Sequence, residues 1–598
     1  MRNFYLLIIA VACSISYGQE VDTNNIELKP VEVISEAQDL KKPVSTAKPP
    51  APLINIVGGL NLMPGVSSQK GAANTAKFTY RGFGARSQYT TSRTLFYLDN
   101  IPITGVQGFS TFEDLNPVYI GRAEMHQPGT NFYPSALGGV VKLKTNDPYI
   151  LGGENHEFKN RFTTGSFGLM GNNLLYTNQK QGITVGYENL QRQGWRENSK
   201  LKRQSLFFNS KRLFGKNLQL LVYGITNRSE IPSSLSQNDF ESNPEKAAES
   251  WGRIEGYEQY DKFITGLTWG NRKANKAYNV TAFYQYRNGF EPRPFNILDD
   301  ESHHGGFRGT LEHKVRGRLN GDIEIFAEYH VGTEEASTFE NLYDSISDNY
   351  NNKGQQLNST KLMSQLVNSG ISWVGQFSDS SVFNRFGYQV AVNSFYRYNQ
   401  FQASGSSNYG SPFTLAPGFS VAYRPWKLFS ELELAVYKSY SIPSLEENLD
   451  PDGSLNAGLR PEEAWTVELG LKDAKGFILV DRLNLYYSEV QNLIVPRVVG
   501  PERVIATNAG SSRHTAVEMI YGFWKSIDLK TASQAPVKNS LKWGVSANGY
   551  YGFFAYKNFS DTTGDFSGNQ LPGFPEWQGT VHAEMAWKRY GSGIFKEF

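Results

Sequence analysis

The amino-acid sequence predicts a mainly β protein: a large antiparallel β-barrel that crosses a membrane, preceded by a compact α+β domain. From about residue 150 to residue 598, segments of roughly ten residues alternate apolar and polar side chains, and about 18 or 19 such strands can be counted. Aromatic residues make up 14% of the 598 residues and charged residues 19%, which excludes a disordered chain. Beyond the first twenty residues, no uncharged apolar run approaches the ~20 residues that a membrane-spanning helix needs.

The first twenty residues have the pattern of a secretory signal peptide. Arg2 supplies a positive start, and the apolar stretch Phe4–Ala12 is too short to span a bilayer. Small residues at Ser16 and Gly18 then predict cleavage after residue 18, so that the signal peptide is 1–18. The alternative is a lipoprotein acylated at Cys13, although Ala10 stands where a larger aliphatic residue is usual.

Residues 19–52 are expected to form a flexible tether, because they lack hydrophobic periodicity and contain the proline cluster 49–52. Within the tether, Leu28–Ser35 is rich in β-branched residues and could add a strand to the edge of another protein's sheet. The alternative interpretation is a linker that contains valines by chance.

Residues 53–147 predict a compact mixed domain. Leu53–Met63 is a helix candidate that ends at the following Pro-Gly pair. Three strands are predicted at Phe78–Arg81, Leu95–Asp99 and Val140–Thr145.

The strands after residue 150 suit a membrane barrel better than a soluble sandwich. In Phe386–Tyr398, one face carries aromatic and valine side chains while the other carries polar ones, including Asn393 and Arg397. The strands approach the length of a tilted membrane crossing, and Tyr and Trp stand at their ends. Short turns alternate with long loops, as in outer-membrane barrels. The longest loops are expected near 229–257, 288–305, 332–360 and 441–462.

Charge and cysteine content exclude several classes of function. Lys and Arg total 59 against 57 Asp and Glu, which leaves a net charge of +2. Nucleic-acid binding needs a strongly basic surface, so a nucleic-acid partner is not expected. The single cysteine forbids an intramolecular disulfide and any cysteine-based metal cluster. His303 and His304 stand together in a predicted loop, but two adjacent side chains rarely close a metal site, so no metal site is predicted. No catalytic signature appears in a supporting context, so no enzyme activity is expected.

A set of motifs resembles the TonB-dependent outer-membrane receptors over nearly the whole chain. Any one motif alone is weak, but together they are specific. In the compact domain they are Met63–Val66, Tyr80–Arg86, Phe96–Ile103, Leu115–Pro117 and Tyr133–Val141. In the barrel they are Ile442–Glu447, Leu459–Glu463, Glu468–Lys472 and Leu571–Pro575. The stretch Ile231–Trp251 is also similar to a loop of ferric citrate receptors.

The resemblance implies a 22-strand barrel (150–598) whose lumen is closed by residues 53–147 as a plug domain. It implies active import of a ferric siderophore or ferric citrate-like chelate across the outer membrane of a Gram-negative bacterium. A TonB-type inner-membrane protein would supply the energy, and iron would enter only as part of the cargo, with no resident cofactor. By position the TonB box lies within residues 28–35 and contains Leu28, Pro30, Val31, Glu32, Val33 and Ile34.

Other functions remain open. Cobalamin, heme or a carbohydrate could replace the ferric chelate, since specificity lies in loops that carry no transferable motif. A passive or adhesive outer-membrane barrel and a soluble secreted β-protein are further alternatives.

The sequence departs from the family pattern in three places. Only one strand, around 579–588, follows Leu571–Gly573, so the chain is expected to lack its last barrel strands. Gln127-Pro128-Gly129 replaces the usual Arg-Gly-Pro, which puts one plug–barrel ion pair in doubt. Only some 34 residues precede the plug, which disfavours receptors with an additional N-terminal domain.

Two plug loops, Arg81–Arg93 and Thr104–Phe112, would face outward in such a fold. Arginine suits anionic chelates, because its planar guanidinium donates paired hydrogen bonds to carboxylate oxygens. Aromatic rings suit planar chelators. The expected ligand contacts are Arg86, Gln88, Tyr89, Arg93 and Gln107. The alternative is that these are solvated loop residues. Arg81 and Arg122 are expected to pair with lumen carboxylates, with Glu463 and Glu468 as candidates.

Overall fold

The structure is a computed structural model that describes most of the chain after residue 44. The described ranges are 45–47, 55–71, 74–85, 91–129, 133–146, 156–213, 217–316, 319–343, 351–377, 386–402, 406–424, 430–448, 456, 458–473, 480–500, 503–508, 510–529, 539–561 and 564–589. The predicted signal peptide and the predicted TonB box lie outside these ranges, as do the candidate ligand contacts Arg86, Gln88 and Tyr89.

The N-terminal domain is built on a five-stranded mixed sheet in the order β1-β6-β7-β4-β5. Its strands are β1 (Ser45–Ala47), β4 (Leu95–Leu98), β5 (Ile101–Pro102), β6 (Ile120–His126) and β7 (Val140–Thr145). A hairpin of β2 (Val66–Lys70) and β3 (Ala76–Tyr80), the helix α2 (Val57–Leu60) and the 3-10 turn η2 (Pro117–Tyr119) complete it. The predicted helix and strands are present, although the helix covers only four residues.

Strand β1 corrects part of the sequence prediction, since residues 45–47 were expected to belong to the flexible tether. β1 pairs antiparallel with β6, with Ser45 opposite Met125 and Ala47 opposite Ala123. An edge strand such as β6 presents unpaired backbone groups, and a short extended segment satisfies them even without a hydrophobic pattern of its own.

The remaining strands form one large antiparallel barrel. In the described residues it contains 19 strands, in agreement with the 18 or 19 predicted, and the order closes with β30 followed by β8. They are β8 (His156–Gly165), β9 (Leu169–Asn178), β10 (Ile183–Arg192), β11 (Leu201–Ser210), β12 (Leu218–Glu230), β13 (Tyr257–Lys273), β14 (Lys276–Pro292), β15 (Ile297–Val315), β16 (Leu319–Asn341), β17 (Lys353–Phe377), β18 (Phe386–Gln402), β19 (Ser406–Gly410), β20 (Thr414–Tyr423), β21 (Glu431–Ser441), β22 (Glu462–Lys472), β23 (Arg482–Gln491), β26 (Ser511–Leu529), β27 (Asn539–Asn558) and β30 (Trp577–Arg589).

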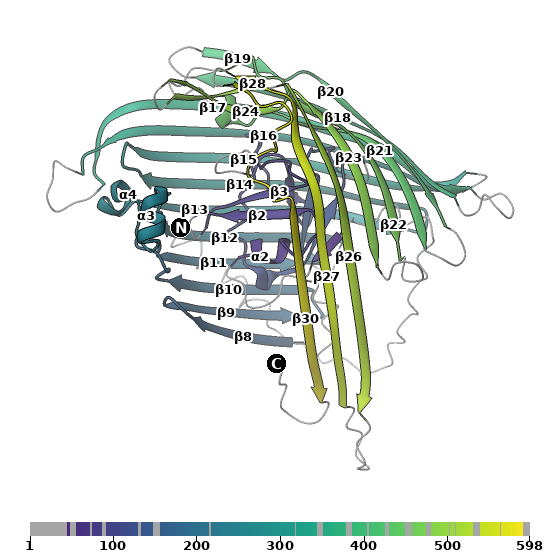
Figure 1. Ribbon diagram of the computed structural model, residues 1–598. Coiled ribbons are helices and arrows are strands. Elements are labelled where there is room, and N and C mark those ends of the chain that lie inside the picture. The colour runs from purple at the N-terminus through teal and green to yellow at the C-terminus, as the bar shows by residue number, and fades with distance from the viewer. Residues whose placement is uncertain are drawn as a thin grey trace.

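Small elements project between the barrel strands. The helices α3 (Gln237–Ser242) and α4 (Glu249–Arg253) lie in the predicted loop between β12 and β13, at one end of the barrel in Figure 1. The helix α5 (Leu445–Asn448) follows β21, and two hairpins follow β23 and β27. These hairpins are β24 (Ile494–Gly500) with β25 (Arg503–Asn508), and β28 (Ser560–Asp561) with β29 (Gly564–Asp565).

The barrel has an apolar exterior and a polar interior. On β18, Val390 and Val392 are 47% and 40% exposed, whereas Asn393 and Arg397 are 1% and 2% exposed. The same pattern of exposed apolar and buried polar side chains recurs along β14, β16 and β26. The exposed side chains there are mostly Val, Ile, Tyr, Phe and Met. A water-soluble sandwich would bury these apolar faces, so the distribution is typical of an outer-membrane barrel.

The predictions of two of the four long loops are wrong. β14 and β15 leave only residues 293–296 between them, and β16 and β17 extend far into the predicted loop 332–360. His303 and His304 consequently lie within β15 rather than in a loop. Where strands extend beyond the membrane, both of their faces can be polar, so the apolar alternation that reveals a strand disappears.

The N-terminal domain lies inside the barrel and fills its lumen, so we call it the plug. Figure 1 shows the purple elements α2, β2 and β3 surrounded by barrel strands. One apolar cluster joins plug and wall: the Tyr119 ring stacks on Phe207, with ring centroids 4.6 Å apart. Gly186 and Gly266 stand where Tyr119 and Ile101 approach the wall, and a Cβ at either glycine would collide with these side chains. The plug therefore packs on strands β9–β14 mainly through apolar contacts.

No helix within the described residues is long and apolar enough to cross a membrane.

Candidate functional site

The plug is attached to the opposite wall by buried ion pairs, and the first of these is centred on Arg81. Its Nη1 lies 2.7 Å from Glu468 Oε2 on β22, and its Nη2 lies 2.7 Å from Glu518 Oε2 on β26. All three side chains are almost completely buried. Burial opposes the positive charge, but the two carboxylates outweigh it and raise the pKa of Arg81 above its ordinary value. Gln127 adds a neutral donor, with Nε2 2.6 Å from both Glu468 oxygens.

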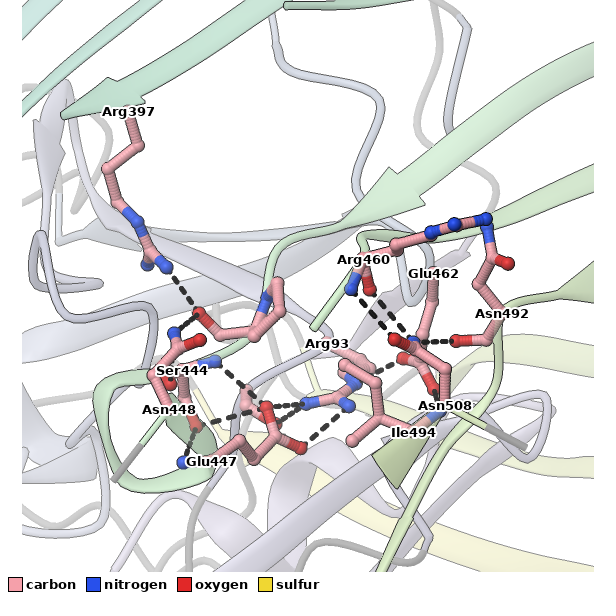
Figure 2. A network of polar contacts seen from close by, with 12 residues as sticks. Arg93, Arg397, Ser444, Glu447, Asn448, Arg460, Glu462, Asn492, Ile494 and Asn508 are labelled. Carbon is pink, nitrogen blue, oxygen red and sulfur yellow. Dashed lines mark hydrogen bonds and ion pairs between the residues drawn. The ribbon is translucent and has the colours of Figure 1, made fainter. Parts of the chain in front are cut away.

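The second attachment is centred on Arg93 (Figure 2). Its Nε lies 2.6 Å from Glu462 Oε2, and its Nη2 lies 2.8 Å from Glu447 Oε1. Glu447 also accepts hydrogen bonds from the backbone and hydroxyl of Ser444, and Glu462 accepts one from the Ile494 backbone. One plug arginine thereby joins the α5 loop, β22 and the β24–β25 hairpin.

Arg93 was predicted to contact the ligand; in this structure its donors bond to protein groups, and contact with a ligand stays a prediction. The side chain is only 5% exposed, and its donors are directed at two carboxylates and at Ser92. Burial raises the pKa of the Glu447 carboxyl, but Arg93 and the Ser444 donors outweigh it and hold that pKa below its usual value. Both partners are therefore charged at neutral pH, and the pair holds the plug in place.

Two further ion pairs secure the plug on the side of β11–β13. Lys262 lies 3.0 Å from Asp114, which also accepts a hydrogen bond from Tyr260. Lys211 lies 2.9 Å from Asp99. Burial raises the pKa of Asp99, but Lys211 and the Thr145 donors outweigh it and lower that pKa to about 2. These bonds cross between plug and barrel, so charged contacts supplement the apolar packing there.

The other predicted plug–barrel pairs do not form as expected. Arg122 pairs with Glu124 on its own strand, at 2.7 Å, and its side chain is 55% exposed. Glu463 pairs with Lys438 of the barrel, at 2.9 Å. Side chains alternate along β22, so Glu462 and Glu468 point into the lumen whereas Glu463 lies on the outward face with Trp465. Of the predicted set, the structure brings together Arg81 and Glu468.

A cavity separates the plug from strands β16–β21. It contains about 640 Å³ of space not filled by atoms, including a part open to solvent. The plug contributes Arg93, Thr104, Gly105 and Gly108 to its lining, and the barrel contributes Arg397 and Ser441 among others. Gln107, a predicted ligand contact, is buried in the same plug loop.

Sequence reasoning missed four residues of this arrangement: Glu447, Glu462, Glu518 and the cavity residue Arg397. Strand alternation alone assigns Glu518 and Arg397 to lumen faces, because their neighbours along the strand are apolar and exposed. No pattern in the sequence indicates which plug residue each of them meets.

Comparison with known proteins matches both the sequence and the fold. Residues 239–596 match the family model described as TonB dependent receptor-like, beta-barrel. The fold is similar to that of the unliganded ferric citrate transporter FecA, with a TM-score of 0.69 at 14% identity, covering 92% of this chain and 80% of that one. It is also similar to the ferric yersiniabactin uptake receptor FyuA from Yersinia pestis, with a TM-score of 0.62 at 12% identity over 92% and 84% of the chains. The pyoverdine receptor FpvA from Pseudomonas aeruginosa PAO1 matches with a TM-score of 0.62 at 11% identity over 88% and 78%.

Proposed function

Because the chain belongs to the TonB-dependent receptor family, we propose that it imports a ferric siderophore or a ferric citrate-like chelate. Receptors of this family are transporters of the Gram-negative outer membrane rather than enzymes. They take up nutrients with a TonB partner that supplies energy from the inner membrane. The identity of the cargo is the part that we propose.

The plug that fills the lumen is the observation that carries the proposal. Passage requires the buried contacts of Arg81 and Arg93 with their glutamates to open or the plug to deform around them. Leaving one member of such a buried pair without its partner costs about 3–5 kcal/mol. The outer membrane has no nucleotide supply, so energy must arrive through a partner that engages an extended segment of the chain.

Under this proposal each segment has a defined role. Residues 1–18 direct secretion, residues 19–52 form the tether apart from the short strand β1, residues 53–147 form the plug, and residues 150–598 form the barrel. The TonB box within 28–35 pairs with the TonB partner through main-chain bonds. Arg86, Gln88, Tyr89 and Gln107 contact the cargo, and the exposed apolar stripes contact lipid.

Two features favour a ferric chelate as the cargo. Ile231–Trp251 is similar to a loop of ferric citrate receptors, and three structural neighbours are named as a ferric citrate transporter, a ferric yersiniabactin receptor and a pyoverdine receptor. The cavity beside the plug is also lined by Arg397, and a guanidinium suits anionic oxygen ligands.

The test is a binding panel on the purified receptor in detergent. Ferric citrate, hydroxamate, catecholate and mixed-ligand siderophores are titrated beside cobalamin, heme and a set of oligosaccharides. We expect saturable binding to at least one ferric chelate, and slower growth of a deletion strain when that chelate is the only iron source. Binding of cobalamin, heme or a glycan instead, with unchanged growth under iron limitation, would contradict the proposal.

A further inference from the structure

Arg397 differs from the other buried arginines of the lumen. Arg203 lies 3.0 Å from Glu188, and Arg308 lies 2.7 Å from Glu328, while the plug residues Arg81 and Arg93 each pair with two carboxylates. Arg397 is 2% exposed, and within the described ranges no carboxylate lies at ion-pair distance from it. It is therefore a buried cation without a direct ion pair among the residues described.

The hydrogen bonds of Arg397 go to backbone carbonyls. One Nη donates to the Pro443 carbonyl and the other to the Val106 carbonyl, at 3.5 Å, while Nε makes no hydrogen bond. The nearby carboxylate of Glu447 is already bonded to Arg93 and Ser444 (Figure 2). Carbonyl oxygens accept hydrogen bonds but do not cancel a full charge, so the direct contacts of Arg397 leave it without an ion pair.

Arg397 also lines the cavity between the plug and strands β16–β21. Gly108 faces it there with φ +90°, and a Cβ at this position would lie 3.4 Å from Arg397 Nη1. Glycine thus keeps the backbone close to the guanidinium without a side chain over it. Thr104 and Ser441 add hydroxyl groups to the same lining.

We propose that Arg397 forms an inner anion-binding site that takes a carboxylate of the cargo on its way between plug and wall. The inference rests on the proposed function and narrows it, because it requires a chelate that carries free or iron-bound carboxylates. A planar guanidinium with an unused Nε donor matches the two oxygens of a carboxylate. The chelate would then lie beside the Arg93 attachment, since both arginines line the same cavity.

The test compares two ferric complexes on the intact receptor by equilibrium dialysis. Ferric citrate carries carboxylates, and a neutral ferric trihydroxamate does not. Arg397→Gln retains donors for the carbonyl oxygens but removes the charge, and we expect it to weaken ferric citrate binding at least tenfold. Binding of the trihydroxamate should not change, and Arg397→Lys should restore part of the ferric citrate affinity.

Arg460→Gln is the matched control, because it removes the same charge from an exposed position in the neighbouring loop. It should leave ferric citrate binding unchanged, and the thermal unfolding of every variant is measured in parallel. Equal ferric citrate binding by Arg397→Gln and wild type would overturn the inner site while leaving the import proposal intact. Equal weakening of both complexes would show that Arg397 is only a structural clamp. If the wild-type receptor binds neither these nor other ferric chelates, the import proposal fails, and the inner site fails with it.

Discussion

Arg81 Nη2 and Glu518 Oε2 are 2.7 Å apart, although the two residues are separated by 437 positions in the chain. The contact joins the end of β3 in the plug to β26 of the barrel, and the Tyr486 ring covers the guanidinium at 4.2 Å. Arg81 has φ 54°, so the chain turns sharply there and directs the side chain at the wall. The receptor therefore closes its lumen with specific charged bonds as well as with packing.

Removal of the Arg81 charge should loosen the plug more than the barrel. Arg81→Met leaves Glu468 and Glu518 buried without the ion-pair partner that they share, and we expect a loss of about 3–5 kcal/mol from plug attachment. Denaturant unfolding followed by hydrogen exchange in the plug measures this loss. Arg122→Met is the control, because that half-exposed side chain pairs only within the plug and should cost less than about 1 kcal/mol. Equal effects of the two variants would contradict the assignment.

Two adjacent glutamates should behave differently when each is neutralised. Glu462 bonds to Arg93 inside the lumen, whereas Glu463 lies on the outward face and bonds to Lys438. Glu462→Gln is expected to weaken plug attachment by about 2 kcal/mol or more, and Glu463→Gln by less than about 1 kcal/mol. Proteolysis of the plug in the purified receptor ranks the two variants. The reverse order would show that the register of β22 is wrong.

Glu113 predicts a pH dependence of plug stability. Burial raises the pKa of this plug carboxyl to about 8. A raised folded-state pKa means that the stabilising contribution is complete below the unfolded value near 4.5 and is lost as the pH rises through about 8. Glu113→Gln should therefore stabilise the plug by a few kcal/mol at pH 9 and change little at pH 4. The free energy of unfolding of the wild type and of Glu113→Gln is measured between pH 4 and pH 9. A constant difference between the two proteins over this range would be incompatible with a buried carboxyl.

Asp99 predicts the opposite pH dependence of stability within the same domain. Its pKa is lowered to about 2, so its contribution is present above the unfolded value near 3.8 and is lost as the pH falls toward 2. Asp99→Asn should therefore destabilise the plug throughout the range from pH 5 to pH 9. It should not change how steeply the free energy of unfolding depends on pH in that range. Unfolding curves for the Asp99 and Glu113 variants, measured together, separate the two effects.

The close approach of Tyr119 to β10 should not tolerate a larger residue at Gly186. A Cβ there would collide with the Tyr119 ring, so Gly186→Ala is expected to destabilise plug packing by about 1–3 kcal/mol. Gly224→Ala on β12 is the control, because no atom lies within 4 Å of the position that its Cβ would take. Thermal unfolding of both variants makes the comparison, and equal midpoints would show that the plug does not pack on β10.

The barrel and the plug could be predicted from the sequence because their determinants are local. Alternation along β18 distinguishes the exposed Val390 and Val392 from the buried Asn393 and Arg397. The strand extension that contains His303 and His304 could not be recognised, because outside a membrane neither face of a strand has to be apolar.

The site was less predictable because it depends on contacts between distant segments. The family motif indicates Glu463 and Glu468 equally well, and only the alternation along β22 shows that Glu462 takes the place expected for Glu463. Arg93 suits ligand binding by its chemistry, but its two carboxylate partners come from positions 447 and 462. Such pairings follow from the way the plug is seated in the barrel, which no local pattern encodes.

The central claim is that the plugged barrel imports its cargo only when a partner engages the tether. The most direct test is uptake of an iron-labelled chelate by cells that carry either the full receptor or a form without residues 28–35. Both forms should bind the chelate at the surface with equal affinity, and only cells with the full receptor should accumulate iron. Equal accumulation of iron by the two forms would contradict import driven by a partner on the tether.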